Sequence, residues 1–306
     1  MDAAALKEAS RSIAGWTGAL AQSVYFAREC HEAYAAIGFE NPIAGEWRER
    51  LVNDPITFHA SRSALLGEVP ALLAAAVFPQ MAPAVVERAV TRRTELCDAA
   101  TLVEARQTGA VAQLRRILGE RPEGIERLAT MVRAGCDAAD VGGRPFAAAL
   151  LARGWAGEPL ADAWHGAEVL RELRGDAHVS AWLARGIAGP QAHILLEYWY
   201  GMGGCGFRRV WGWAAAQLDE AEADLVDRGL VRDGELTAAG RALRDEIEDA
   251  TDESMLGVMR ALADELDDLA RIAEPLSRAV VAGKGSLVSR PSYFSWLATL
   301  PAYQFG

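Results

Sequence analysis

The chain has 306 residues, of which 51% are hydrophobic and 24% are charged, and it carries a formal net charge of −11. This length can bury a core of normal size without disulfides or metals, and the composition indicates a globular, mainly helical protein. The negative charge argues against DNA as a partner, because nucleic-acid binders gain most of their affinity by neutralising phosphates.

The cysteines and the apolar runs bear on where the protein works. The four cysteines, Cys30, Cys97, Cys136 and Cys205, form neither a CxxC pair nor an evenly spaced framework, which is typical of free thiols in a reducing cytosol. The longest apolar run, "VPALLAAAVF", falls short of the roughly 18 residues of a membrane span, and the first twenty residues lack a signal-peptide pattern. We therefore expect a cytoplasmic protein with no membrane partner.

The N-terminal part of the chain is predicted to be helical throughout. Helical apolar spacing extends to Gly38, which suits a left-handed cap, and the break "FENPIAGEW" follows. Further helices are predicted in "SRSALLGE", "PALLAAAVF", "APAVVERAVTRR", "LCDAATLVEARQTGAVAQLRRILGER" and "EGIERLATMVRAG", with no strand before about residue 135. A joint rich in glycine and small residues, with one short helix in "FAAALLARGW", then leads onward. We divide the chain into regions 1–140, 141–252 and 253–306.

The stretch "WHGAEVLRELRGDAH" (164–178) has a plain structural explanation. Pro159 suits the first turn of a helix that ends at Leu173 or Arg174, and Gly175 suits the position just past that end. Asp176 then suits the N-cap of a following helix, "AHVSAWLARG". Capping and salt bridges would account for about half of the stretch on this interpretation.

A metal site is a weaker interpretation of the same stretch. His165 and Glu168 are neighbours on a helix, and His178 would supply a third ligand if the chain folded back. The spacing lacks the two-turn signature of HExxH, so capping and salt bridges are favoured over a metal.

A ligand site without a metal is the stronger chemical hypothesis. His165 or His178, near the normal histidine pKa, would move a proton, and Arg174 would clamp a carboxylate of the substrate. The catalytic candidates are His165, His178 and Glu172; the substrate-binding candidates are Arg174, Asp176, Trp164, Arg62, His59 and Tyr198. The cofactor, if there is one, stays unknown at this point, since no GxSxG elbow, P-loop or dinucleotide fingerprint is present.

A winged helix-turn-helix is predicted further along the chain. Two helices, the second running through "LDEAEADLVDRG", precede "RGLVRDGELT", in which Asp233-Gly234 is a strong signal for a two-residue hairpin. A helix with Thr237 as N-cap follows. This order defines an all-α fold class with an embedded winged helix that carries a minimal two-stranded wing.

The sequence resembles known families at this point. "LVDRGLVRDGELTAAGRALRDEIE" is similar to the wing region of the MarR-type winged-helix regulators. The span from Tyr25 to Thr251 resembles an uncharacterised actinobacterial helix-turn-helix family, through "EAYAAIGF", "SRSALLG", "WHGAEVLRELRGDAH" and the wing. The resemblance covers about three quarters of the chain and implies a fold; it does not imply an activity.

The helix that would enter the DNA groove is acidic. It carries Asp219, Glu220, Glu222, Asp224 and Asp227 against Arg228 alone. A recognition helix normally presents basic and polar side chains to the major groove, so the composition of this helix argues against DNA binding.

Aromatic residues gather late in the chain and allow two interpretations. They are Tyr198, Trp199, Tyr200, Trp211 and Trp213, and then Tyr293, Phe294, Trp296, Tyr303 and Phe305. They predict either a pocket for a flat apolar molecule or core packing with a tail strapped across the surface, and packing is favoured for each single residue. The apolar stripe of "MLGVMRALADELDDLARIAEPLSRAVVAG" predicts a long helix that packs on its own chain or forms a homodimer.

The sequence thus favours a small organic molecule as the partner of a winged-helix protein that no longer binds DNA. We expect an enzyme of specialised metabolism that isomerises, cyclises or dehydrates its substrate with acid–base residues. The alternatives are a ligand-responsive MarR-like transcription regulator and a non-catalytic ligand carrier.

Overall fold

The structure is a computed structural model, which describes residues 2–203, 206–287 and 290–305, and it confirms the predicted mainly helical fold. In the first half the α-helices are α1 (Ala3–Ala21), α2 (Arg28–Ile37), α3 (Pro55–Ser63), α4 (Ala71–Val77), α5 (Pro83–Leu96), α6 (Ala99–Leu118), α7 (Ile125–Asp137) and α8 (Pro145–Ala152). In the second half they are α9 (Pro159–Leu183), α10 (Gly189–Trp199), α11 (Ala215–Asp227), α12 (Ala238–Ser254), α13 (Leu256–Ala261), α14 (Leu266–Ala282) and α15 (Arg290–Leu297). Short 3-10 helices cover Gln22–Tyr25, Ala64–Leu66, Phe207–Trp211 and Pro301–Tyr303.

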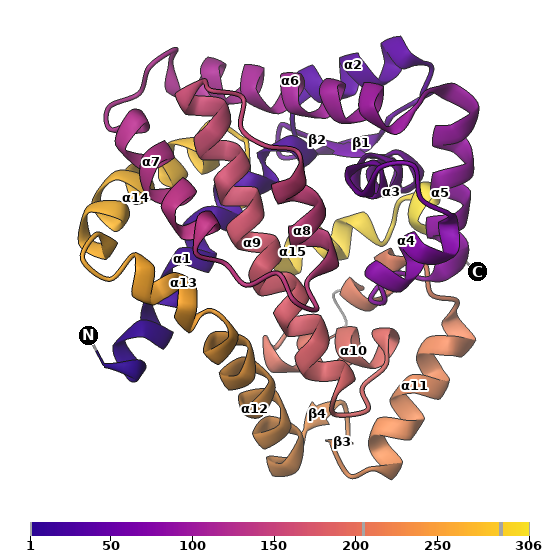
Figure 1. Ribbon diagram of the computed structural model, residues 1–306. Coiled ribbons are helices and arrows are strands. Elements are labelled where there is room, and N and C mark those ends of the chain that lie inside the picture. Colours follow the sequence, from indigo (N-terminus) through magenta and orange to yellow (C-terminus); the bar gives the residue numbers. More distant parts are fainter. Residues whose placement is uncertain (1, 204–205, 288–289, 306) are drawn as a thin grey trace.

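Helix α9 runs through the centre of the molecule and joins its upper helical body to its lower part (Figure 1). The Glu158 side chain caps its N-terminus by accepting hydrogen bonds from the N–H groups of Leu160 and Ala161. The predicted end at Leu173 or Arg174 is wrong, because the helix continues through Gly175 to Leu183. Nearly every turn of α9 is buried against other helices, and this packing outweighs the low helix propensity of one glycine.

Asp176 is likewise not the N-cap of a new helix. It lies inside α9, and its Oδ2 accepts hydrogen bonds of 2.9 Å from the backbone N–H groups of Phe146 and Ala147. Those residues begin α8, whose own N-cap residue, Arg144, makes no capping bond through its side chain. Asp176 is therefore a helix-capping residue, as its residue type suggests. The helix that it caps is α8, about thirty residues earlier in the sequence.

A β-hairpin begins in the segment "FENPIAGEW", which was predicted to be only a break between helices. Strands β1 (Ile43–Trp47) and β2 (Arg50–Asn53) pair antiparallel, which corrects the expectation of no strand before residue 135. The two turn residues, Arg48 and Glu49, have φ angles of 47° and 65°. Glycine or asparagine usually marks such a turn, so the local sequence gave no hairpin signal.

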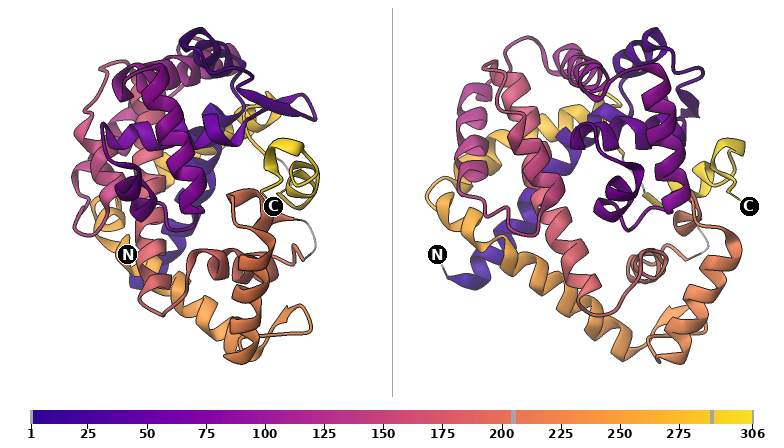
Figure 2. Two further views of the ribbon diagram at one scale, coloured as in Figure 1. Left: turned by 90° about the vertical axis from the view of Figure 1, so that its right-hand side faces the viewer. Right: turned by 45° about the vertical axis from the view of Figure 1, so that its right-hand side comes forward.

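The predicted winged helix is present in the second half. Helices α10 and α11 pack together, strands β3 (Val231–Arg232) and β4 (Glu235–Leu236) form the short wing, and α12 follows. Asp233 and Gly234 form the turn with φ angles of 53° and 76°, as the Asp-Gly signal predicts. Thr237 caps α12 by accepting a hydrogen bond from the N–H of Gly240. Figures 1 and 2 show these elements together at the lower end of the molecule.

The buried apolar residues form three clusters. The main core draws on residues between Leu6 and Val280 and so includes parts of all three predicted regions. A second, aromatic cluster joins the C-terminal segment to the β1–β2 hairpin and to Met202, Phe207 and Val210, and Figure 2 shows the C-terminal segment beside that hairpin. The third lies inside the winged helix, around Leu225 and Ile247. The space where the three clusters meet is the candidate site described below.

The predicted long C-terminal helix is broken into α13 and α14 at residues 262–265. Its apolar stripe is buried within the chain, where α13 and α14 pack against α1 and α7. The stripe consists of Met255, Val258, Leu262, Leu266, Leu269 and Ile272, each 9% exposed or less. Packing on the same chain, one of the two predicted alternatives, therefore occupies this face.

Cys30, Cys97 and Cys136 are free thiols, and Cys205 lies outside the described residues.

No single helix in the described ranges has both the length and the apolar character needed to cross a membrane. The bent pair Pro55–Leu66 and Ala71–Val77, angled at 93°, passes that test only when the two are taken together.

Candidate ligand-binding cavity

A cavity of about 1170 Å³ lies where the three apolar clusters meet. One side is α1, whose Ala14, Gly15 and Gly18 line the space with little or no side chain. A Cβ atom built on Gly15 or Gly18 would have no heavy atom within 4 Å. The other walls come from α3, α9, α12, the hairpin and the C-terminal segment. Known ligand pockets commonly measure about 300–1,000 Å³, so the space is ample for an organic molecule.

A buried ion pair forms one wall of this cavity. Arg62 of α3 donates two hydrogen bonds to Glu172 of α9, at 3.1 and 2.8 Å, and a third of 2.9 Å to the Tyr25 hydroxyl. Its guanidinium carbon lies 4.6 Å from the centre of the Phe146 ring. Burial alone would raise the pKa of Glu172, but the positive charges of Arg62 and Arg171 lower it below its ordinary value. Glu172 is therefore held as a carboxylate, and its charge is already matched.

Arg174 of α9 also lines the cavity and is more exposed than Arg62. It donates hydrogen bonds of 2.9 Å to Glu248 and 3.1 Å to Asp252, both on α12. One turn further along α9, Nδ1 of His178 lies 3.1 Å from the Thr251 hydroxyl. Burial lowers the pKa of His178 to about 4, so its ring is neutral at pH 7. The predicted carboxylate clamp is thus already occupied by two carboxylates of the protein.

Asp176 combines a structural role with an unusual acidity. Burial raises the pKa of this carboxyl to about 6, although the N–H groups of Ala147 and Phe146 act in the opposite direction. Among the cavity-lining carboxyl groups for which a shift is resolved, this is the one that titrates close to neutral pH. A group that titrates near the working pH can both accept and release a proton.

Replacing Asp176 tests its role as the cap of α8. Asp176→Ala leaves two buried N–H groups without an acceptor and is expected to lower the free energy of unfolding by about 2 kcal/mol. Asp176→Asn keeps an acceptor oxygen at this position and should lose much less. Urea unfolding followed by circular dichroism measures both; equal losses for the two variants would contradict the capping role.

Four neutral side chains in the cavity lining carry buried polar atoms without a hydrogen-bond partner. Both amide atoms of Asn53, Nδ1 of His59, Oε1 of Gln80 and Nε1 of Trp211 are in this position. Asn53 is 2% exposed and His59 is 3% exposed. Burial, followed by the Arg62 charge, lowers the pKa of His59 to about 3, so its ring is neutral. Sequence reasoning proposed His59 but missed Asn53 and Gln80, because only the fold brings these segments to one space.

Six of the nine predicted site residues line the cavity: Arg62, His59, Glu172, Arg174, Asp176 and His178. His165 and Trp164 are buried elsewhere, beside the ion pair of Arg106 with Glu168. His165 packs edge-on against Trp155, and burial lowers its pKa to about 4.

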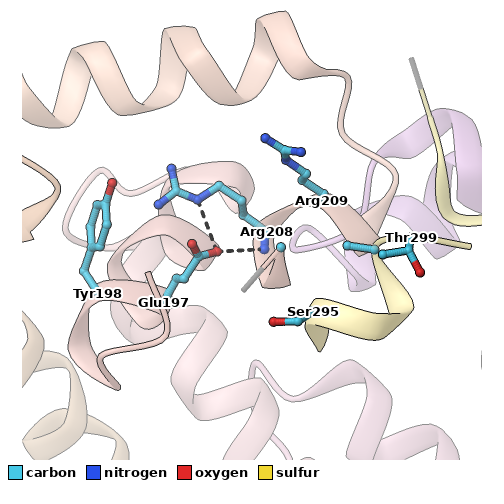
Figure 3. Close-up of a pocket in the computed structure, with 8 residues that line it drawn as sticks. Glu197, Tyr198, Arg208, Arg209, Ser295 and Thr299 are labelled. Carbon is cyan, nitrogen blue, oxygen red and sulfur yellow. Dashed lines mark hydrogen bonds and ion pairs between the residues drawn. The ribbon is translucent and has the colours of Figure 1, made fainter. Parts of the chain in front are cut away.

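Tyr198 lines a separate and smaller pocket, of about 420 Å³, shown in Figure 3. Its hydroxyl donates to Glu222, and Arg208 bridges Glu222 and Glu197. The dashed lines in Figure 3 mark the contacts of Arg208 with Glu197. The polar groups of this pocket are thus largely bonded to one another, and Tyr198 is not part of the large cavity.

The geometry of α9 does not suit the metal alternative. His165 and His178 are on one continuous helix, thirteen positions and roughly 20 Å of axial rise apart. Glu168, the intermediate candidate, is paired with Arg106. Within the described ranges, no three side chains of the metal-binding types come together closely enough to hold an ion.

Comparison with known proteins gives one finding. A model described as a helix-turn-helix family matches residues 10–287. Neither the curated proteins nor the solved structures include a significant match.

Proposed function

The chain belongs to this helix-turn-helix family, and we propose that it uses the scaffold to bind a small organic molecule in the large cavity. The observation that carries the proposal is the cavity itself, whose lining combines aromatic rings, glycines without side chains and buried polar groups. Such a mixture of apolar surface and a few polar groups is typical of ligand sites.

The charge of α11 supports a role other than DNA recognition. Asp219, Glu220, Asp224 and Asp227 are exposed on this helix, while Glu222 is tied to Arg208. The wing offers Arg232 as its basic residue. Because four exposed carboxylates would repel a phosphate backbone, we propose that the winged helix no longer binds DNA.

Acid–base conversion of the bound molecule is the next step of the proposal. Asp176 is the cavity group best suited to move a proton, with His178 nearby on the same helix and Glu172 fixed as an anion. Isomerisation, cyclisation and dehydration are reactions that one such group can assist. A ligand carrier with the same cavity would bind the molecule without turnover.

Blocking the cavity from α1 tests ligand binding. Gly18→Phe places a ring in open space, so the fold is expected to persist while affinity for the neutral dye Nile red falls at least tenfold. Gly18→Ala should keep binding and raise the free energy of unfolding by up to about 1 kcal/mol, since glycine weakens a helix interior. Fluorescence titration measures the affinity.

Gly257→Phe is the matched control. Gly257 is a helical glycine with equally open surroundings, but it does not line the cavity. This variant should bind Nile red as the wild type does. Unchanged binding by Gly18→Phe, or equal losses in both phenylalanine variants, would mean that the dye binds elsewhere.

A ligand-responsive regulator is the second candidate, and one observation favours it. Asp245, Glu248 and Asp249 of α12 line the cavity, and α12 is the helix that directly follows the wing. A bound molecule would therefore touch the winged helix itself. Specific binding to duplex DNA from the gene's own upstream region, weakening steeply with salt, would identify the regulator.

A further inference from the structure

The positive charges in the cavity wall are already matched by carboxylates of the protein. Arg62 and Arg171 both contact Glu172, and Arg174 binds Glu248 and Asp252. The remaining arginine of the described lining, Arg11, pairs with Asp249 and Asp252 at 3.3 and 2.6 Å. An anionic ligand would find the positive charge of each of these arginines already paired with a carboxylate of the protein.

The surplus charge of the lining also disfavours anions. Asp176 and Asp245 line the same space, and neither is paired with an arginine in the described contacts. The lining histidines, His59, His178 and His193, all have pKa values lowered by burial, to about 3 or 4, and add no positive charge at pH 7. Bringing a further negative charge into this space would cost free energy.

Apart from Nε of Arg62 and of Arg174, whose charges are already paired, the groups left for a ligand are neutral hydrogen-bonding groups and aromatic rings. Asn53 offers one donor and one acceptor group, and His59 offers a ring nitrogen, all buried and without partners. Buried polar atoms of this kind are uncommon, because each costs free energy until it finds a partner. Tyr293, Phe294 and Trp211 are rings of the same lining, suited to stacking on a flat molecule.

We infer that the ligand is an uncharged, flat, multi-ring molecule that presents a paired hydrogen-bond donor and acceptor, as a carboxamide or lactam does, to Asn53 and His59. This inference rests on the proposed function, since it names the class of molecule that the cavity binds. It replaces the carboxylate that the sequence analysis assigned to Arg174.

Three probes with the same ring system separate the effects of charge and of hydrogen bonding: anthraquinone-2-carboxamide, the near-isosteric anthraquinone-2-carboxylate, and unsubstituted anthraquinone. Binding is followed by quenching of tryptophan fluorescence, because Trp182, Trp199 and Trp211 line the cavity. The carboxamide is expected to bind at least tenfold more tightly than either of the others. Equal or tighter binding of the carboxylate would overturn the inference and leave ligand binding itself intact. No saturable quenching with any probe would count against the proposed function as well.

A variant of Asn53 distinguishes recognition from a structural role. Asn53→Leu removes unpartnered polar atoms at similar volume, so the urea midpoint should hold or rise while carboxamide affinity falls to that of anthraquinone. Gln113→Leu is the matched control, because Gln113 is 1% exposed with an unpartnered Oε1 but lies outside the cavity. It should leave the order of the three probes unchanged. A lower urea midpoint for Asn53→Leu with an unchanged probe order would refute the assignment.

Discussion

Between pH 6.5 and pH 4.5 the protein is expected to lose most of its stability. Four of its five histidines, His31, His59, His165 and His193, are 5% exposed or less, and His178 keeps a quarter of its side chain exposed. Burial lowers the pKa of His59 to about 3 and that of each of the others to about 4. The folded protein therefore resists protonation over the range in which the unfolded chain, with pKa values near 6.5, takes up protons.

The direction and size of this pH dependence of stability follow from the difference in bound protons between the folded and unfolded states. Because the unfolded state binds more protons, the stabilising contribution is complete above about pH 6.5 and is lost as the pH falls toward 4. Each fully buried histidine contributes up to about 1.4 kcal/mol per pH unit in this window, so four give roughly 5 kcal/mol per unit. Asp176 and Asp54, whose pKa values burial raises, act in the opposite direction, but they are fewer than the buried histidines. Folding stabilities of about 5–15 kcal/mol would be exhausted within two units.

Urea unfolding at pH 7.5, 6 and 5 measures this dependence. The variant His165→Phe should show a shallower dependence, because it removes one titrating group that lies outside the cavity lining. Urea midpoints that stay constant from pH 7.5 to pH 5 would mean that the histidines are not held neutral.

Arg62→Met is expected to lower the free energy of unfolding by about 3–5 kcal/mol, because it leaves Glu172 buried with only the partly exposed Arg171 as a partner. The double variant Arg62→Met, Glu172→Leu removes both charges and should recover a large part of this loss. Denaturant unfolding at pH 7.5 measures all three proteins.

Arg278→Met provides the comparison for an exposed pair. Arg278 contacts Glu274 across one helical turn at 3.3 Å, with both side chains more than half exposed. Its removal should cost at most about 0.5 kcal/mol. If Arg62→Met lowered the free energy of unfolding by less than about 1 kcal/mol, water would have to reach the Arg62–Glu172 pair. The pair would then not be a buried ion pair.

The winged helix was predictable because its signals are local. Asp233-Gly234 specifies the turn of the wing, Thr237 caps the next helix, and the apolar spacing of α11 and α12 is regular. The signals that misled were also local. Gly175 and Asp176 have the sequence signature of a helix boundary, but nearly every turn of α9 is buried, and Asp176 caps α8 instead. Tertiary packing determines where such a helix ends, and a local sequence pattern contains no information on that packing.

Local sequence patterns also predicted only part of the cavity lining. Six predicted residues came together because four of them lie on α9 and the other two on α3, and the ion pair of Arg62 and Glu172 joins these helices. Asn53 was missed because its segment had no strand signal, since Arg48 and Glu49 replace the usual turn residues. The small side chains on α1 gave no functional signal, because the space they leave depends on distant helices.

A crystal structure of the protein grown with Nile red tests the central claim most directly. We expect one dye molecule between α1 and α9, in contact with Gly18 and with the aromatic rings of the C-terminal segment. Side chains that fill this space, or dye bound only on the outer surface, would contradict the proposal that this cavity binds a small organic molecule.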